Sequence, residues 1–293
     1  MVNQLSTPLT TPLAPILVFD SGVGGLSIVQ ALRERMPSLP LVYACDNAAF
    51  PYGQKTETWL KKRVHSVVSG LVQEIQPSLI VLACNTASTL TLPELRQSFN
   101  LPIVGVVPAI KPAAFMTRSG HIGLLATYGT VNRPYTQKLI DEFASDCKVI
   151  KVGSNRLVEL AEIYLAGGKL ADQDLLEILQ PLLAEQRLDT VILGCTHFPL
   201  LQPQLARVAE QAGAAPWQWI DSGAAIARRV VQLLNEAGYT QPIPQEFFSP
   251  SCFLTKPLAT HSQLPQSLQR FGFKHLKQLN GFELIDPVFQ PIL

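Results

Sequence analysis

Two cysteines, Cys84 and Cys195, stand in matching surroundings. Each follows an apolar run and is followed at once by small polar residues, in the segments Leu79–Ala87 and Val191–His197. Each segment predicts a buried strand, a thiol at its carboxyl end and a turn into a helix. In an open α/β sheet, ligands bind at this end of the strands. One such thiol could be a nucleophile, whereas two could form a matched acid and base pair facing one substrate.

The residues after each cysteine, Asn85-Thr86 and Thr196-His197, are typical of helix starts. Backbone N–H groups at a helix N-terminus favour a thiolate and can bind an anion. His197 could exchange a proton with Cys195, or form half of a Cys-x-His metal pair, although no further ligand cluster accompanies it. Buried cysteines can also be small core residues. We favour that interpretation for the three cysteines without such surroundings, Cys45, Cys147 and Cys252.

The segment Asp20-Ser21-Gly22-Val23-Gly24-Gly25 follows a predicted strand and opens a helix. Its glycines allow a tight turn and a close approach of the backbone to a ligand. Neither GxGxxG nor a lysine-containing P-loop is present, so NAD and ATP are poor candidates. We expect this loop to bind a small carboxylate, with Ser21 donating its hydroxyl. Asp20 could accept a proton from a nearby thiol or cap the following helix.

Another loop, Asp46–Gly53, follows a predicted strand and contains a proline and a glycine. Such residues shape a turn, and loops at this edge of a sheet carry binding groups. We therefore expect the loop to lie beside the first thiol.

These loops need a parallel sheet to bring them together. Apolar runs typical of strands alternate with helical patterns, which indicates α/β units. The apolar spacing from Leu60 to Ile75 is that of one helix face. The predicted strands are Ile16–Asp20, Leu41–Cys45, Leu79–Cys84, Ile103–Val107, Ile122–Thr127, Val149–Val152, Thr190–Cys195 and Trp217–Asp221.

A weak internal repeat relates the two halves: a strand and polar turn at Ile16–Gly22 precede Cys84 much as Ile122–Gly129 precede Cys195. All α/β units look somewhat alike, but we prefer two similar, pseudo-symmetric α/β domains that each supply one thiol to a central cleft. We expect a flexible extension over residues 1–15, a first domain from 16–105 plus 217–293, and a second from 106–216.

The overall composition excludes several classes of protein. The net charge is +1 and 47% of residues are hydrophobic, which indicates a globular chain without a nucleic-acid surface. No apolar run reaches the ~18 residues of a membrane span, and the first 15 residues do not resemble a signal peptide. Five cysteines without CxxC spacing indicate the reducing cytoplasm rather than a disulfide framework or a structural zinc site.

Four segments carry a family resemblance: Phe19–Leu26, Asp46–Gly53, Ala83–Ala87 and Leu193–Leu200. In this order and spacing they closely resemble the cofactor-independent aspartate/glutamate racemase family, and within it the bacterial glutamate racemases. The resemblance runs from about Ile16 to Ser222. It implies an isomerase that interconverts L- and D-glutamate without pyridoxal phosphate, another cofactor or a metal. It also implies that the product serves peptidoglycan synthesis, and with it cell wall biogenesis and cell shape.

The resemblance also implies roles for individual residues. Cys84 would exchange the α-proton on the D-glutamate side with help from Asp20. Cys195 would do so on the L-glutamate side with help from His197. Ser21 and the Tyr52-Gly53 turn would hold one carboxylate, and Asn85, Thr86 and Thr196 the other. The substrate-binding set is thus Asp20, Ser21, Tyr52, Gly53, Asn85, Thr86, Thr196 and His197.

Some alternatives stay open. A racemase of aspartate or another acidic amino acid would use the same groups. A single-thiol hydrolase or an amino-acid-binding protein needs no paired thiols. The chain departs from the family at Gly153–Arg156, where a Cys-Pro pair is common, which leaves the role of Glu159 open. Phe198 replaces a frequent tyrosine. The sequence allows a homodimer but does not specify one.

Overall fold

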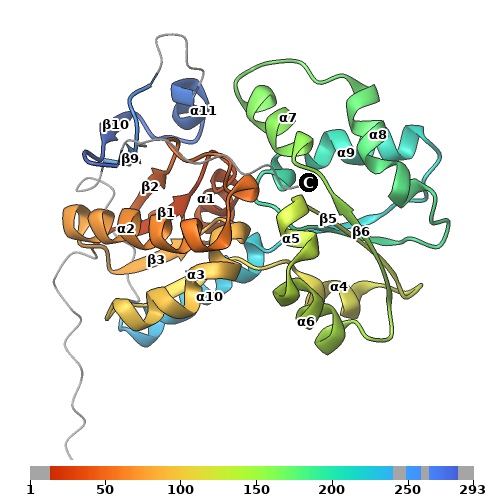
Figure 1. The fold of residues 1–293 in the computed structure, drawn as a ribbon, viewed down its shortest axis with the longest axis horizontal. Coiled ribbons are helices and arrows are strands. Elements are labelled where there is room, and N and C mark those ends of the chain that lie inside the picture. Colours follow the sequence, from red (N-terminus) through yellow and green to blue (C-terminus); the bar gives the residue numbers. More distant parts are fainter. Residues whose placement is uncertain (1–13, 240–248, 259–263, 283–293) are drawn as a thin grey trace, which may run out of the picture.

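The computed structural model describes residues 14–239, 249–258 and 264–282. They form two parallel sheets with helices packed around each, and the two units lie side by side (Figure 1). The predicted fold class, two similar α/β units about a central cleft, is confirmed. The predicted N-terminal extension lies outside the described residues except for Ala14 and Pro15.

The first sheet has the strand order β10-β9-β2-β1-β3-β4, and all its neighbours run parallel. Four strands come from the first part of the chain, and two that the sequence did not predict return from its C-terminal part. The strands are β1 (Ile16–Asp20), β2 (Leu41–Cys45), β3 (Leu79–Leu82), β4 (Ile103–Gly105), β9 (Ser251–Leu254) and β10 (His275–Gln278).

The second sheet has the order β6-β5-β7-β8 and is also parallel. This order repeats the β2-β1-β3-β4 part of the first sheet, so the weak repeat in the sequence corresponds to a repeated topology. Both thiols follow equivalent strands, β3 and β7. The strands are β5 (His121–Ala126), β6 (Lys148–Gly153), β7 (Thr190–Leu193) and β8 (Gln218–Ile220).

Helices connect the strands and cover the sheets. Those around the first sheet are α1 (Leu26–Arg35), the 3-10 turn η1 (Tyr52–Gln54), α2 (Glu57–Ile75), α3 (Asn85–Ser98), α10 (Gly223–Glu236) and α11 (Leu264–Arg270). Those around the second are α4 (Ile110–Met116), α5 (Tyr128–Asn132), α6 (Pro134–Phe143), α7 (Arg156–Leu165), α8 (Asp172–Leu183), the 3-10 turn η2 (Phe198–Leu201) and α9 (Gln202–Gln211).

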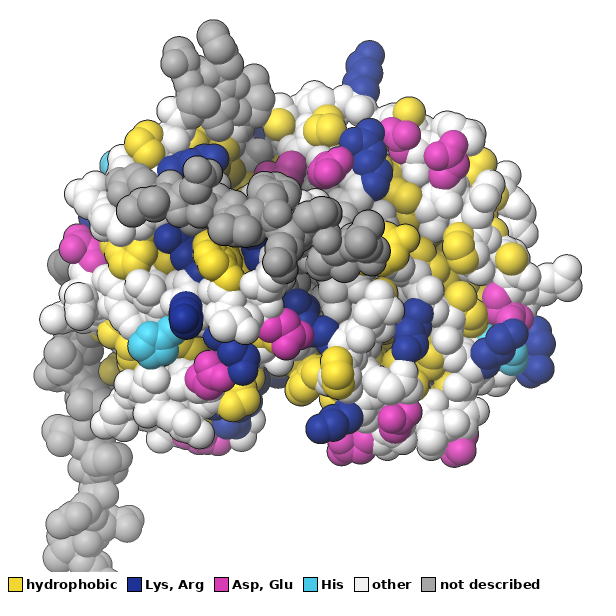
Figure 2. All heavy atoms as spheres, viewed as in Figure 1, with side chains coloured by type: hydrophobic (Ala, Val, Ile, Leu, Met, Phe, Trp, Pro, Cys, Tyr) yellow, Lys and Arg dark blue, Asp and Glu magenta, His cyan; other side chains and the backbone are white. Residues whose placement is uncertain are grey.

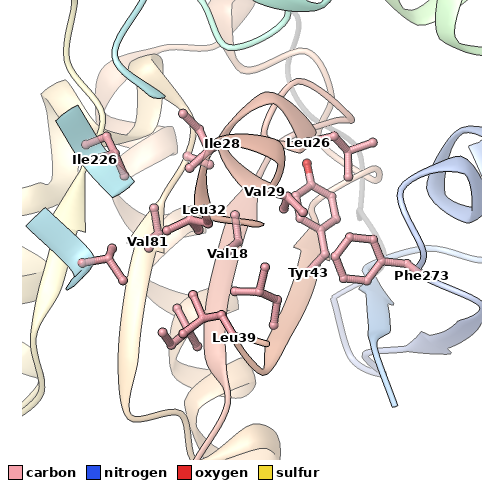
Figure 3. Close-up of a cluster of buried hydrophobic side chains, with 14 of the residues drawn as sticks. Val18, Leu26, Ile28, Val29, Leu32, Leu39, Tyr43, Val81, Ile226 and Phe273 are labelled. Atoms are coloured by element: carbon pink, nitrogen blue, oxygen red, sulfur yellow. The ribbon is translucent and has the colours of Figure 1, made fainter. Parts of the chain in front are cut away.

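Each sheet is buried on both faces. In β1, Val18 belongs to the core under α1 whereas Phe19 belongs to the core on the opposite face, because successive side chains of a strand alternate. Figure 3 shows the first of these cores, where Ile226 from α10 and Phe273 from the C-terminal part join residues of α1 and the sheet. A strand buried on both faces needs a continuous apolar run, which is why these strands are visible in the sequence.

The chain crosses between the two units twice. It leaves the first sheet after β4 and returns before α10, which packs on α1. The two crossings touch, since the Ser222 hydroxyl donates a hydrogen bond to the Val107 carbonyl. Strand β8 pairs with β7 and so lies in the second sheet, although the predicted range 217–293 placed it with the first. The division into domains otherwise stays a prediction.

Within the described ranges, no helix combines the length and apolar character needed to cross a membrane. Figure 2 shows basic and acidic side chains interspersed over one face of the molecule, in keeping with a net charge of +1.

Candidate active site

The ten residues singled out from the sequence line one pocket between the two sheets. They come from the carboxyl ends of β1, β3 and β7 and from the loop after β2, so both units contribute. They are Asp20, Ser21, Tyr52, Gly53, Cys84, Asn85, Thr86, Cys195, Thr196 and His197. That they act on a substrate stays a prediction.

Cys84 lies at the N-terminus of α3, as the sequence predicted. It is the N-cap residue, it is 6% exposed, and its Sγ lies 3.9 Å from the Ser21 hydroxyl. Burial raises the pKa of the Cys84 thiol well above its usual range, and the neighbouring Asp20 carboxylate adds to the effect. The backbone N–H of Ala87 opposes it only in part. Cys84 is therefore held as a neutral thiol that can donate a proton.

Cys195 has a different setting from the one predicted. The residues after it form the 3-10 turn η2 rather than an α-helix, and α9 begins only at Gln202. Pro203 explains the break, because a proline ring inside a helix clashes with the carbonyl four residues earlier. The Sγ of Cys195 lies 3.8 Å from Nδ1 of His197. The local partner of this thiol is thus an imidazole.

His197 is held between Cys195 and Glu162. Its Nε2 lies 2.8 Å from Oε1 of Glu162, which comes from α7. Burial alone would lower the pKa of His197, but the hydrogen bonds to Cys195 and Glu162 outweigh it and raise the pKa well above its usual value. The imidazolium form is favoured, and it places a positive charge beside the Cys195 sulfur.

Asp20 joins the two units. Its Oδ1 accepts a 2.5 Å hydrogen bond from the backbone N–H of Ser21, and its Oδ2 accepts one of 3.0 Å from the Thr196 hydroxyl. Burial raises the pKa of Asp20, although His197 and these hydrogen bonds oppose the rise. The N-cap of α1 is Gly25, so the interpretation of Asp20 as a helix cap is wrong.

The glycine loop after β1 approaches protein groups. A Cβ on Gly24 would collide with the His197 ring and lie 2.7 Å from Oγ1 of Thr196. One on Gly22 would lie 2.6 Å from Oε1 of Glu162. The prediction that these glycines bring the backbone close to a ligand therefore needs correction. At Gly22 and Gly24 the backbone closely approaches side chains of the second unit instead.

Tyr52 lines the pocket, but its hydroxyl is engaged elsewhere. It donates a 2.6 Å hydrogen bond to Oδ2 of Asp46. Asp46 also accepts two hydrogen bonds from Arg63 and one from the Thr255 hydroxyl near the end of β9. This network fixes the loop after β2, and it leaves the backbone at Tyr52 and Gly53, rather than the phenol, to face a ligand.

Asn85 offers a free acceptor in the pocket. The residue is 4% exposed, and its side-chain oxygen has no hydrogen-bond partner among the described residues. A buried polar atom without a partner is costly, so it calls for a donor from a bound molecule. An ammonium group would supply one.

The sequence did not reveal three further residues of this site. Two of them are Thr127, the N-cap residue of α5, and Thr130 within that helix. The Thr127 hydroxyl donates a hydrogen bond to the Thr130 hydroxyl. The third is Glu162, an ordinary acidic residue on an amphipathic helix, which gave no local signal. Glu159 also lines the pocket, and it pairs with the exposed Arg156.

Comparison with known proteins shows which family this chain resembles. Residues 26–230 match the family model of Asp/Glu/Hydantoin racemases. The glutamate racemase of Klebsiella pneumoniae is 48% identical over 275 residues, which cover 94% of each chain. That of Pectobacterium atrosepticum is 47% identical over 281 residues, which cover 95% of this chain and 96% of the relative.

Solved structures of glutamate racemases share the fold. The Escherichia coli enzyme, crystallised with L-glutamate and the activator UDP-MurNAc-Ala, matches with a TM-score of 0.82 and 45% identity, over 91% of this chain and 98% of that one. The Thermus thermophilus enzyme, in complex with β-chloro-D-alanine, matches with a TM-score of 0.74 and 28% identity, over 94% of this chain and 100% of that one.

Proposed function

The chain belongs to the Asp/Glu/Hydantoin racemase family, and on this premise we propose that it interconverts L- and D-glutamate with two thiols, Cys84 and Cys195. The activity is that of an isomerase. The observation that carries the mechanism is the placement of two buried thiols from two different sheets in one pocket, each beside its own proton partner.

In the direction from L- to D-glutamate, the Cys195 thiolate removes the α-proton. The electron pair left on Cα is delocalised into the α-carboxylate. The Cys84 thiol then delivers its proton to the opposite face, which leaves Cys84 as a thiolate and Cys195 as a thiol. The reverse reaction starts from that state, so the two thiols exchange roles with direction.

The electrostatics of the site support this assignment. The raised pKa of His197 keeps an imidazolium beside the Cys195 sulfur, 3.8 Å from Nδ1. The raised pKa of Cys84 keeps that group protonated and ready to act as the acid. Asp20, itself buried with a raised pKa, is the group beside Cys84 that can take up the proton of its thiol when D-glutamate binds.

The remaining polar groups fit the charged parts of glutamate. The Asn85 side-chain oxygen accepts a hydrogen bond from the substrate ammonium, and the Thr86 hydroxyl and the backbone N–H of Thr196 donate to the α-carboxylate, since the Thr196 hydroxyl already donates to Asp20. Ser21 and the backbone at Tyr52 and Gly53 bind the second carboxylate. Fixed donors at the α-carboxylate stabilise the carbanion, because charge develops there in the transition state.

The site needs reduced thiols, so we place the enzyme in the cytoplasm. There, D-glutamate serves peptidoglycan synthesis and with it the cell wall and cell shape. Glutamate is the small-molecule substrate of the proposed site. A homodimer stays a prediction.

Hydrogen exchange in D₂O tests the mechanism. The purified enzyme, without added cofactor, should convert L-glutamate to a racemic mixture while deuterium enters Cα. L-Aspartate in a parallel reaction should remain optically active. No exchange with glutamate, or exchange only after pyridoxal phosphate is added, would refute the proposal.

Single thiol variants sharpen this test. Cys84→Ala should lose racemisation but still exchange the α-proton of L-glutamate through Cys195, and Cys195→Ala should exchange that of D-glutamate alone. Either variant racemising at the wild-type rate would rule out the two-base mechanism.

A further inference from the structure

One buried arginine lies close to the pocket without lining it. Arg133 is 7% exposed, and within the described ranges it is the one buried lysine or arginine. It stands between α5 and α6, as the N-cap residue of α6. The pocket itself is lined, among described residues, by the carboxylates of Asp20 and Glu159 but by no lysine or arginine.

Arg133 lies directly behind the pocket wall. A Cβ built on Gly129 would be 3.4 Å from Nη2 of Arg133 and 3.2 Å from the carbonyl oxygen of Gly53, a lining residue. One built on Gly53 would be 3.5 Å from Cβ of Thr127, another lining residue. One layer of small residues therefore separates the guanidinium from the end of the pocket where Gly53 and Thr127 meet.

The charge of Arg133 is only weakly compensated. Its nearest recorded carboxylate is Glu57 in the first turn of α2, with Nε and Oε1 3.5 Å apart, and the Glu57 side chain is 59% exposed. Nε and Nη1 of Arg133 make no hydrogen bond to the described residues. Burying a cation in this way costs free energy, because it loses water without gaining a full set of partners. Its positive potential consequently extends into the neighbouring pocket.

We propose that Arg133 is a specificity-determining residue that selects substrates with a second carboxylate. This inference rests on the proposed racemase function and assigns to Arg133 the preference for an acidic over a neutral side chain. Glutamate brings two carboxylates and one ammonium into a pocket whose lining holds the carboxylates of Asp20 and Glu159 against the single imidazolium of His197. A cation behind Gly53 and Thr127 offsets that repulsion at the end of the pocket where the side-chain carboxylate binds. It acts through its field and without touching the substrate.

A purely structural role makes different predictions. Arg133 lies in the second unit and Glu57 in the first, so their ion pair could simply hold the two units together. An ion pair with that role would affect the turnover of every substrate equally, and removing either Arg133 or Glu57 would reduce activity in the same way. An electrostatic effect instead distinguishes substrates with charged side chains from those with neutral ones. It also predicts that replacing Arg133 raises the KM of glutamate whereas replacing Glu57 lowers it.

The experiment compares Arg133→Gln, Arg133→Lys and Glu57→Gln with the wild type at low ionic strength. L-Glutamate and L-glutamine are the substrates, and α-proton exchange in D₂O is the readout. We expect Arg133→Gln to raise the KM of glutamate on the order of tenfold, with kcat little changed. The glutamate to glutamine ratio of kcat/KM should fall accordingly, and Arg133→Lys should retain most of it. Glu57→Gln should lower the KM of glutamate.

Three outcomes would overturn the inference: an unchanged ratio in folded Arg133→Gln, equal losses of kcat for both substrates, or an unchanged or raised KM for glutamate in Glu57→Gln. If Arg133→Gln does not fold, the KM of Glu57→Gln decides. A wild-type enzyme that exchanges no α-proton of glutamate would refute the proposed function itself, which separates the two failures.

Discussion

The hydroxyl of Thr196 donates a 3.0 Å hydrogen bond to Oδ2 of Asp20, 176 positions away in the sequence. Asp20 ends a strand of the first sheet, whereas Thr196 follows a strand of the second. In a second contact between the units the donor lies in the first unit and the acceptor in the second: Oε1 of Glu162 accepts a hydrogen bond from the backbone N–H of Val23. The polar contacts that bring the two units together thus involve the same carboxylates that serve the thiols.

Thr196→Val tests the first of these contacts. Removing the hydroxyl leaves a buried carboxylate with one partner fewer, and a hydrogen bond to a charged group contributes about 1.5–3 kcal/mol. We expect turnover of glutamate to fall roughly 10- to 100-fold. Thr196→Ser keeps the hydroxyl and should retain most of the activity. Equal losses in both variants would mean that the hydrogen bond to Asp20 is not what matters.

Glu162→Gln tests the partner of His197. Without the carboxylate, the pKa of His197 should fall, which NMR titration of the imidazole proton would detect. A raised histidine pKa stabilises the fold fully below the unfolded value of about 6.5, and this stability is lost as the pH rises through the folded value. The free energy of unfolding of Glu162→Gln should therefore fall furthest below that of the wild type in mildly acidic solution, and the difference should decrease as the pH rises.

Glu159→Gln is the matched control for Glu162→Gln. Glu159 lies on the same helix as Glu162 and lines the pocket, but it pairs with Arg156 and not with His197. The titration of His197 should be unchanged in this variant. A similar shift in both variants would assign the effect to general charge in the pocket and not to the contact with Glu162.

Gly24→Ala tests the close approach of the glycine loop to the other unit. The new methyl group would meet the His197 ring and Oγ1 of Thr196, and overpacking of this kind costs typically about 1–3 kcal/mol. Thermal unfolding should show a melting temperature several degrees lower. Gly53→Ala, whose Cβ would make ordinary contacts at 3.5 Å, should melt close to the wild type. Equal melting of all three proteins would show that the loop can move away.

Asp189→Asn tests a carboxylate far from the pocket. Although partial burial raises its pKa, hydrogen bonds from Thr117, Arg118 and Ser119 lower the pKa of Asp189 to about 2. A lowered pKa stabilises the fold above the unfolded value of 3.8, and this stability is lost as the pH falls toward 2. The melting temperature should therefore drop at pH 6 in the variant, and the difference from wild type should shrink below pH 3.5.

The exposed Asp146 provides the control for that pH dependence. Asp146→Asn should melt like the wild type at every pH. A constant difference between Asp189→Asn and the wild type across the acidic range would contradict ionisation of Asp189 as its source.

Much of the fold could be predicted because its signals are local. The strands β1 and β2 lie at the predicted residues, since a strand buried on both faces is a continuous apolar run. The short strands β9 and β10 were missed, because β10 lies at the edge of the sheet and carries the polar residues His275, Lys277 and Gln278. Strand β9 lies beside β2, whose residues are some 200 positions away in the sequence, and β10 joins the sheet only through β9, so no local pattern records their place.

The same physical reason divides the site. The sequence by itself determined which residues follow the strand ends, and so it identified both thiols and the Asp20 and His197 beside them. Only the tertiary structure decided which groups distant in the sequence complete each pair, Thr196 of the second unit for Asp20 of the first, and Glu162 of the same unit for His197. It also placed Arg133 behind the pocket wall. Strand periodicity and turn chemistry act over a few residues, whereas these contacts arise from packing elements that are distant in the sequence, within the second unit for Glu162 and between the two units for Thr196.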